Sequence, residues 1–401
     1  MTDQIAQLPR LSRVAHAAHC KRCLSGALLL LFDLAAGLSD RRRCIKAINR
    51  LLIVFLRTLR LTVGSLSNNR LALAFYCIGS LDLLGVLDEH IPGSDRDEWR
   101  AWLWEQQTRG KYGSGFRPSP FMTGERQSNN DLPADYTDYD TPHIIMTYTA
   151  LLSLAILRDD FSRLDRPGLL KFLRACQRSD GSFSTVPGSN ESDLRTLYCA
   201  FAISSMLNDW SGVDVPRAVS FIATCRTYEG GYGQSPFCEA QGGTTYIAVA
   251  SLSLASAGAG RVDYTMTPSE RQVTISWLLR NQDSSGGFCG RTGKDADACY
   301  CFWCGAALQI LGAGELVDSD KLAAFLARCQ FKYGGISKAP GENPDPYHTY
   351  LSLAALSMYT PSIHKAGDNM ESWKFKPLDP LLNAREDTAS WIREHVPAKL
   401  A

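Results

Sequence analysis

Three residues with metal-binding side chains stand at the starts of two apolar segments: Asp297 and Cys299 in one, His348 in the other. A carboxylate, a thiolate and an imidazole together suit zinc, and catalytic zinc takes three protein ligands and keeps a fourth position open. A substrate thiol entering that position would lose its proton, because the metal stabilises a thiolate far better than a thiol. Asp-x-Cys is a common pattern, however, and a single His is more often hydrogen-bonded than metal-bound. These residue types alone therefore leave open whether they form a zinc site.

Basic side chains surround the same segments. Arg291, Lys294 and Lys338 lie close in sequence to the three candidate ligands, and Tyr300 adds a phenol donor. Cations and helix N-termini together bind anions such as diphosphate. Taken singly, the three cations are more simply explained as solvated surface charges. Together with a metal that generates a thiolate, they predict attack of that thiolate on a carbon atom whose leaving group is diphosphate.

A short polar turn with a pair of small residues recurs along the chain and separates the elements that must position these residues. Successive strong copies begin about fifty residues apart, which is the period of a two-helix repeat. Glycine lets the backbone leave a helix through positive φ and approach neighbouring helices closely, so we interpret these pairs as architectural. The strong copies lie at residues 177–183, 228–232, 282–288 and 330–336, and a weaker copy lies at 112–116.

The segments between the turns have helical apolar patterns of two kinds. Arg271–Leu279 and Lys321–Cys329 place apolar residues at spacings of three and four, which is typical of a helix with one buried face. Thr245–Leu254 and Tyr350–Leu356 are apolar nearly all round, which is typical of a helix buried on all sides. We therefore predict an all-α fold, an α/α barrel or toroid of repeated helix pairs with inner and outer helix rings. The alternative is an open helical solenoid.

The composition is that of a large globular chain. Of its 401 residues 45% are hydrophobic, and the formal net charge of +1 gives no reason to expect a nucleic acid partner. Residues 1–64 form a basic N-terminal segment, residues 65–360 the predicted barrel domain, and residues 361–401 a tail with a short helix that packs on the barrel or on a partner subunit. Thirteen cysteines without a signal peptide predict a cytoplasmic protein without a disulfide framework. No apolar run approaches the roughly 20 residues of a membrane span.

The segment from Gly286 to Trp303, Gly-Gly-Phe-Cys-Gly-Arg-Thr-Gly-Lys-Asp-Ala-Asp-Ala-Cys-Tyr-Cys-Phe-Trp, resembles the zinc segment of protein prenyltransferase β subunits. Asp345-Pro-Tyr-His348 is similar to their zinc-histidine segment, and the resemblance extends from about Ser67 to Ser357. It implies one zinc ion held by the three candidate ligands, an α/α barrel paired with a separate α subunit, and a lipid tail inside an aromatic-lined barrel cavity.

Within this family, three positions resemble type I geranylgeranyltransferases. Lys338 stands where farnesyltransferases have an Asp associated with magnesium, so the resemblance implies that Mg²⁺ is not required. Ala72 replaces a bulky Trp, and Leu351 replaces a Tyr, which leaves room for a four-isoprene chain. The implied reaction transfers geranylgeranyl from geranylgeranyl diphosphate to the Cys of a C-terminal C-a-a-X sequence, with X usually Leu or Phe, on Rho-type small GTPases and similar proteins.

The resemblance also implies roles for single residues. Arg291, Lys294, Tyr300 and Lys338 would hold the diphosphate. Arg195, Trp303 and His143 would line the lipid and peptide pocket, together with the two size-determining positions, Ala72 and Leu351. A histidine that merely ends a helix is an equally good explanation of His143.

The chain departs from the family pattern in two places. Gln241 replaces a family His that contacts diphosphate; its amide still donates a hydrogen bond but carries no charge. Residues 27–59, approximately, are an insertion, either an added helix or a wrongly translated gene segment. The basic, acid-poor N-terminal segment, residues 1–64, also fits a transit peptide or a membrane-surface helix. The alternative functions are a farnesyltransferase β subunit, disfavoured by the three positions above, and a non-catalytic scaffold that binds isoprenylated proteins.

Overall fold

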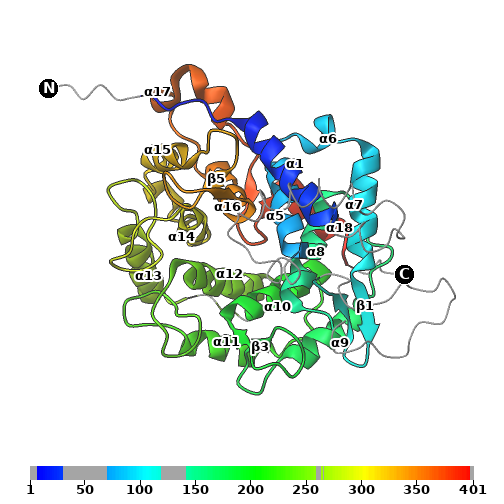
Figure 1. Cartoon of the computed structure of the whole chain (residues 1–401). Helices are drawn as coiled ribbons and strands as arrows, with labels where there is room; N and C mark the ends of the chain where they lie inside the picture. Colours follow the sequence, from blue (N-terminus) through cyan, green and yellow to red (C-terminus); the bar gives the residue numbers. More distant parts are fainter. Residues whose placement is uncertain (1–6, 30–69, 119–140, 259–262, 265, 398–401) are drawn as a thin grey trace.

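Six helices form a closed inner ring in a computed structural model, which describes residues 7–29, 70–118, 141–258, 263–264 and 266–397 (Figure 1). Each of these helices contacts the next one in the series, and the last contacts the first. Most residues of each inner helix are buried, as the apolar segments predict. The inner helices are α5 (Arg70–Leu83), α8 (Ile144–Ile156), α10 (Leu194–Leu207), α12 (Gly242–Gly258), α14 (Ala298–Ile310) and α16 (Pro346–Met358).

An outer helix precedes each inner helix in the chain and covers the ring from outside (Figure 1). In α9 the buried residues Leu169, Phe172, Leu173 and Cys176 follow the spacing of a one-sided helix. The prediction of an α/α barrel with inner and outer rings is thus confirmed. The outer helices are α1 (Arg13–Leu29), α7 (Gly93–Glu105), α9 (Arg166–Cys176), α11 (Val215–Thr224), α13 (Pro268–Arg280) and α15 (Ser319–Cys329).

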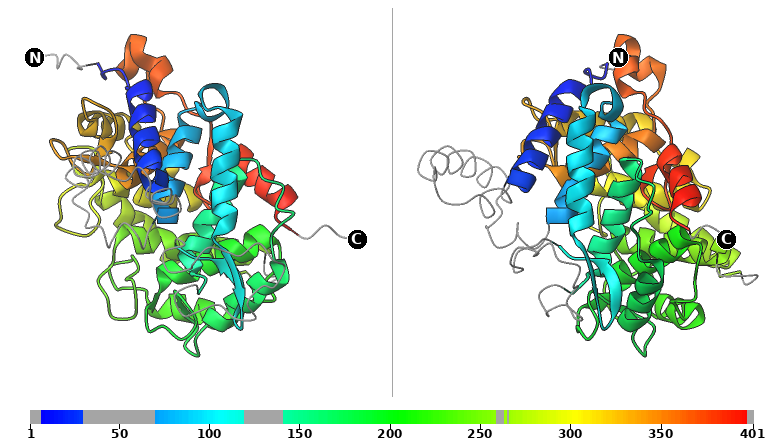
Figure 2. Two further views of the ribbon diagram at one scale, coloured as in Figure 1. Left: turned by 45° about the vertical axis from the view of Figure 1, so that its right-hand side comes forward. Right: turned by 90° about the vertical axis from the view of Figure 1, so that its right-hand side faces the viewer.

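Short elements connect and close this frame. Within the described ranges, four antiparallel pairs of short strands lie in the connections between helices, and isolated residue pairs continue this pattern in the repeat turns. The pairs are β1 (Gln107–Gly110) with β2 (Gly113–Phe116), β3 (Phe183–Ser184) with β4 (Ser192–Asp193), β5 (Ile336–Ser337) with β6 (Pro344–Asp345), and β7 (Leu378–Asp379) with β8 (Ala384–Arg385). The remaining helices are α6 (Leu87–His90), η2 (Gly314–Leu316), α17 (Ile363–Ala366), η3 (Gly367–Trp373) and α18 (Glu386–His395), the last of which packs on α8 and α10 near the C-terminus (Figure 2).

The repeat glycines pack each turn against the following outer helix. Gly286 has a φ of +91°, and a Cβ atom there would overlap the carbonyl of Lys321 in α15. Gly334, with a φ of +97°, meets Ala15 of α1 in the same way. Helix α1 therefore takes the place of the sixth outer helix and closes the outer ring. We accordingly propose to count α1 with the barrel domain; the insertion at about 27–59 lies almost entirely outside the described residues.

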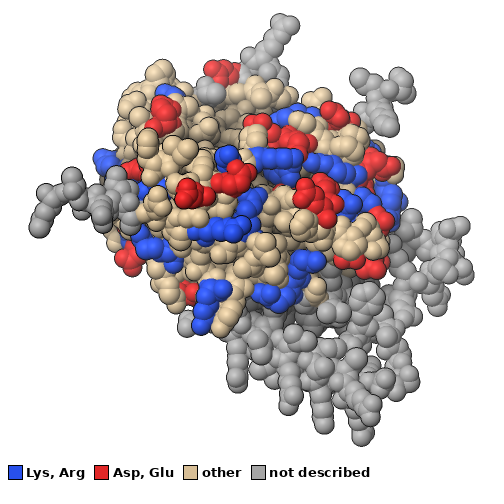
Figure 3. Space-filling model, turned by 90° about the horizontal axis from the view of Figure 1, so that it is seen from above, with Lys and Arg blue, Asp and Glu red and all other residues tan. Residues whose placement is uncertain are grey.

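The mixed surface charge and the unpaired cysteines agree with the near-neutral net charge and with the expected absence of a disulfide framework. Basic and acidic side chains are interspersed on the face seen in Figure 3. The cysteines within the described ranges are all unpaired. No helix in the described part of the chain is both long and apolar enough to cross a membrane.

Candidate metal centre

Two aspartates start the helices that carry the candidate metal ligands. Asp297 is the N-cap of α14, and its carboxylate accepts a hydrogen bond from the backbone N–H of Cys299 at 2.9 Å. Asp345 caps α16 in the same manner and accepts from the N–H of His348 at 2.9 Å. The two N-caps fix where α14 and α16 begin. These helices are neighbours in the inner ring, and the candidate ligands at their starts lie together, so both first turns are at the same rim of the barrel.

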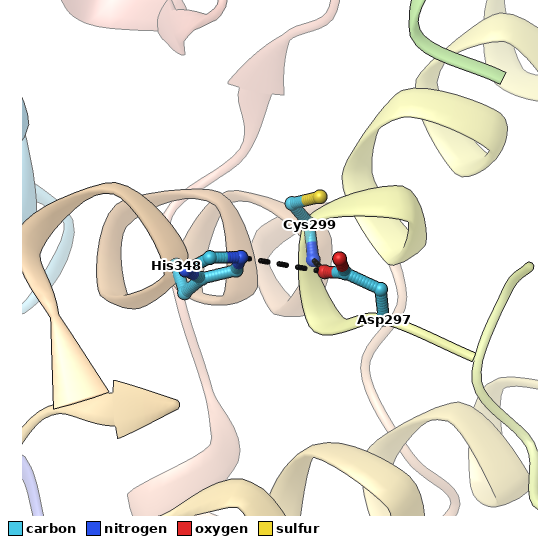
Figure 4. A group of neighbouring side chains, drawn as sticks. All are labelled: Asp297, Cys299 and His348. Atoms are coloured by element: carbon cyan, nitrogen blue, oxygen red, sulfur yellow. Dashed lines mark hydrogen bonds and ion pairs between the residues drawn. The ribbon is translucent and has the colours of Figure 1, made fainter. Parts of the chain in front are cut away.

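The three predicted ligands meet at this rim (Figure 4). One potential ligand atom from each of Asp297, Cys299 and His348 lies within 4.8 Å of the other two. The Nε2 atom of His348 is 3.4 Å from Asp297 Oδ1, and the two side chains are only 14% and 13% exposed. A carboxylate, a thiol and an imidazole that converge in a largely buried space fit the ligand set of a catalytic zinc ion.

Asp345 orients the histidine, a role that the sequence did not assign to it. Its Oδ2 lies 2.6 Å from Nδ1 of His348, which leaves Nε2 directed toward Asp297. Metal-binding histidines usually have such a partner on the second ring nitrogen. The sequence held one indication of this role: Asp345 stands three residues before His348, at the position where the helix begins.

The protonation of the three groups reflects burial and their mutual contacts. Burial lowers the pKa of His348, but hydrogen bonds with Asp297 and Asp345 outweigh burial and raise that pKa to about 9. Burial and the nearby Asp297 charge raise the pKa of the Cys299 thiol well above its usual range. Without a cation the site therefore holds a neutral thiol and a charged imidazole. A bound divalent cation would favour the thiolate and the neutral imidazole instead.

Tyr347 connects both helices of the site. Trp303 donates its indole N–H to the Tyr347 hydroxyl oxygen at 3.0 Å. Because an indole can only donate, the hydroxyl accepts in this bond and keeps its own proton for a second partner. The hydroxyl also lies close enough to the Cys299 thiol to oppose the rise of its pKa. The Tyr347 ring packs edge-on against His348, with centroids 5.0 Å apart. Tyr347 thus lies beside two of the three candidate ligands, a role that its place in the sequence did not indicate.

The predicted diphosphate residues gather around the starts of α12 and α14. The backbone N–H of Gly242, next to Gln241, donates to the carbonyl of Gly290, next to Arg291, at 2.8 Å. The Tyr300 ring lies against these same two glycines. Gln241, Arg291 and Tyr300 are therefore brought together.

The three basic side chains of this group differ in their contacts. Arg291 forms an ion pair with Glu239 at 2.8 Å. Lys294 and Lys338 are exposed and have no ion-pair partner among the described residues. The carbonyl of Lys338 accepts the backbone N–H of Ala298 at 2.9 Å, which places this lysine beside the candidate metal ligands.

The predicted pocket residues occupy the same rim at other helices. Arg195, at the start of α10, pairs with the α10 N-cap Asp193 at 2.7 Å. His143 is the N-cap of α8; burial and then the Arg195 charge lower its pKa to about 4, and its buried Nδ1 has no hydrogen-bond partner within the described ranges. Ala72 on α5 is half-buried and Leu351 on the neighbouring α16 is fully buried.

Comparison with known proteins identifies the architecture. The chain matches the family of the prenyltransferase alpha-alpha toroid domain over residues 43–384. It is 37% identical over 298 residues to the geranylgeranyl transferase type-1 subunit beta of Arabidopsis thaliana, covering 72% of this chain and 78% of the relative. The protein of the same name from Dictyostelium discoideum is 39% identical over 302 residues, with 72% and 83% covered.

More distant relatives share the fold. The protein farnesyltransferase subunit beta of Schizosaccharomyces pombe is 29% identical over 255 residues, covering 59% of this chain and 63% of the relative. A chain of Candida albicans protein geranylgeranyltransferase-I, solved in complex with GGPP, superimposes with a TM-score of 0.74 at 23% identity. That superposition covers 97% of this chain and 100% of the other.

Proposed function

Since this chain belongs to the prenyltransferase alpha-alpha toroid family and is related to type-1 geranylgeranyl transferase β subunits, we propose that it is the catalytic β subunit of a type I protein geranylgeranyltransferase. It transfers geranylgeranyl from geranylgeranyl diphosphate to the cysteine of a C-terminal C-a-a-X sequence. The observation that carries the proposal is the convergence of Asp297, Cys299 and His348 within 4.8 Å.

Asp297, Cys299 and His348 would hold one zinc ion, with Asp345 fixing the histidine ring. When bound, zinc keeps the substrate cysteine as a thiolate at neutral pH. The thiolate sulfur then forms a bond to C1 of the lipid, while the bond from C1 to the diphosphate oxygen breaks and the diphosphate leaves with the electron pair. In this scheme Tyr347 holds the Cys299 and His348 side chains in place.

The basic residues of the rim would bind the diphosphate and stabilise its departing charge. Arg291 exchanges its exposed partner Glu239 for the diphosphate, and Lys338 stands next to the start of α14. A lysine ammonium at this place offsets charge that magnesium would otherwise offset, so we propose that the reaction needs no Mg²⁺. Gln241 contributes a neutral amide donor where relatives of the family have a histidine.

The remaining partners follow from the family. We propose that the chain forms a heterodimer with a prenyltransferase α subunit. Its protein substrates are C-a-a-X proteins such as Rho-type small GTPases. Ala72 and Leu351 lie on adjacent inner helices and are smaller than the Trp and Tyr of farnesyltransferases, so they leave space for the fourth isoprene unit.

A competition experiment tests this function. The chain is purified with a matching α subunit, without added magnesium, and offered equal concentrations of farnesyl and geranylgeranyl diphosphate with C-a-a-Leu and C-a-a-Ser peptides. Mass spectrometry of the products should show mainly the geranylgeranylated Leu peptide. Mainly farnesylated Ser peptide would instead support a farnesyltransferase, and no product from the zinc-loaded heterodimer would favour a non-catalytic scaffold.

A further inference from the structure

Helix α1 lies beside the chain segment that carries Asp345. It contacts α5 and also α16, which carries the candidate ligand His348 in its first turn (Figure 1). Two histidines of α1, His16 and His19, are buried, and both face the connection from α15 to α16. The Nδ1 atom of His16 accepts the N–H of Gly335 in that connection. His19 meets the same connection with its ring, and this contact leads toward the candidate metal centre.

The ring of His19 packs against strands β5 and β6. A Cβ atom on Gly335, the residue before β5, would lie 2.9 Å from Cδ2 and 3.0 Å from Nε2 of His19. The same Cβ would lie 2.7 Å from Cβ of Pro344 in β6. Gly335 also has a φ of +85°, which favours glycine. The His19 ring and Pro344 therefore enclose Gly335 so closely that an added methyl group would not fit.

Pro344 connects this contact to the candidate metal centre. It directly precedes Asp345, and both residues belong to β6, which pairs with β5. Side chains of successive strand residues point to opposite faces. The Pro344 side chain faces α1, and the Asp345 side chain faces His348, whose Nδ1 lies 2.6 Å from Asp345 Oδ2. Because proline has a fixed φ, the backbone yields little at this position, and the support given to Pro344 reaches Asp345.

The protonation of His19 shows how its ring acts. Burial lowers the pKa of His19 to about 4, the Arg22 and His16 charges lower it further, and the Asp345 charge opposes this lowering. The Nε2 atom of His19 lies 3.6 Å from the Sγ atom of Cys23, whose pKa burial raises to about 12. At neutral pH both groups are therefore uncharged. His19 supports β6 by packing and not by charge.

We propose that His19 is a positioning residue for the candidate metal centre. Its ring supports Pro344 from the α1 side of β6 and so holds Asp345 in the place from which it fixes the candidate zinc-binding histidine. The proposal rests on the function proposed above, which places zinc at the three candidate ligands. Helix α1 thereby gains a second role besides closing the outer ring. Because residues 30–69 separate α1 from α5, the metal centre depends on a helix that lies before the predicted insertion.

The test compares the wild type with three variants, all as heterodimers with the α subunit. His19→Ala removes the ring that packs on Pro344. His19→Phe keeps an aromatic ring at this place and removes the two ring nitrogens. The matched control is Cys20→Ala, because Cys20 is also buried in α1 but lies near Ser80 of α5 instead of β6.

Two quantities are measured for each protein. Competition with a chromogenic chelator gives the zinc affinity, and the melting temperature of the metal-free heterodimer reports the stability of the fold. We expect His19→Ala to weaken zinc binding by about tenfold or more, because Asp345 loses its support. His19→Phe should stay within about threefold of the wild type, because the packing is kept. Cys20→Ala should lower the melting temperature and leave the zinc affinity unchanged, because it removes packing between α1 and α5.

Equal zinc affinities of His19→Ala and the wild type would overturn the proposal. An equal loss in His19→Phe would also overturn it, because packing of the ring would then not be the cause. So would an equal loss in Cys20→Ala, since any disturbance of α1 would then have the same effect. If the wild-type heterodimer binds no zinc, the proposed function fails and this inference fails with it. If the wild type binds zinc and His19→Ala binds it equally well, the inference alone fails.

Discussion

At the scale of single residues, the candidate metal centre is assembled by helix capping. Asp297 is both an N-cap and a candidate ligand, and the second N-cap, Asp345, holds the candidate ligand His348. The residue types of Asp297, Cys299 and His348 could be identified from the sequence. Their meeting in space could not, because it depends on two helices becoming neighbours in a ring.

Replacing Asp345 by Asn should weaken zinc binding by about tenfold to a hundredfold, because the histidine loses its charged partner on Nδ1. The affinity is measured by competition with a chromogenic chelator. Asp318→Asn is the matched control, since Asp318 caps α15 through the N–H of Lys321 and lies away from the site. Equal zinc affinity in the two variants would mean that Asp345 acts only as a helix cap.

Gln241 is the residue at which the chain departs from the family within the candidate diphosphate site. Gln241→His should raise the rate of single-turnover prenyl transfer by about tenfold, because an imidazolium adds charge-assisted stabilisation of the leaving diphosphate. The experiment compares the rates of the two proteins across a range of pH, and the gain should diminish as the pH rises and the imidazolium deprotonates. An unchanged rate at every pH would show that Gln241 does not contact the diphosphate.

At the scale of elements, the repeat turns could be predicted because their glycines have a local sequence pattern. The role of α1 could not, because residues 30–69 separate it from the next described helix, α5, on which it packs, and because it also contacts the last repeat turn at the far end of the chain. The structure pairs α1 with the last repeat turn. The Nδ1 atom of His16 accepts the N–H of Gly335 at 2.9 Å, and its Nε2 lies 3.0 Å from Gln330 Oε1.

Gly286→Ala should destabilise the protein by about 2–4 kcal/mol, because a positive φ disfavours alanine and its Cβ would overlap the Lys321 carbonyl. Gly188→Ala is the control: this glycine also has a positive φ, of +81°, but no atom lies within 4 Å of an added Cβ. It should cost only about 1–2 kcal/mol. Chemical denaturation gives both values, and equal losses would contradict the close packing of the turn.

His16 should make the closure of the ring sensitive to acid. Burial lowers its pKa to about 4, so the unfolded chain binds a proton more readily than the folded protein between pH 6.5 and 4. The titration of His16 therefore leaves the free energy of unfolding unchanged above pH 6.5. It lowers that free energy by about 3 kcal/mol as the pH falls toward 4.

A His16→Gln variant removes this titration, and its stability should therefore depend less on pH than that of the wild type. Burial also lowers the pKa of the neighbouring His19 to about 4, and the Arg22 and His16 charges contribute to this lowering. Removing His16 therefore relieves part of the His19 shift, which reduces the pH dependence in the same direction. The melting temperature at pH 7, 5.5 and 4 is measured for each protein. Parallel pH profiles would contradict the assigned role of His16.

At the scale of the whole molecule, the closed double ring followed from the alternation of amphipathic and fully apolar segments. The placement of the turn Pro380–Asn383, between β7 and β8, did not. Its carbonyls accept hydrogen bonds from four tyrosine hydroxyls spread from Tyr148 to Tyr350, and its own sequence, Pro-Leu-Leu-Asn, has no pattern that indicates burial in a barrel. Long-range hydrogen bonds to carbonyls leave no mark on the residue types that accept them. The ring shape, the rim of helix N-termini and the candidate metal centre together support one account, in which the chain activates a substrate thiol at zinc.

X-ray absorption at the zinc edge of the purified heterodimer tests this account most directly, because it counts the sulfur ligands of the metal. The account predicts one sulfur ligand, from Cys299, in the free protein, and two after addition of a C-a-a-Leu peptide whose cysteine takes the open position. Zinc that is absent, or a sulfur count that stays the same when the peptide binds, would contradict it.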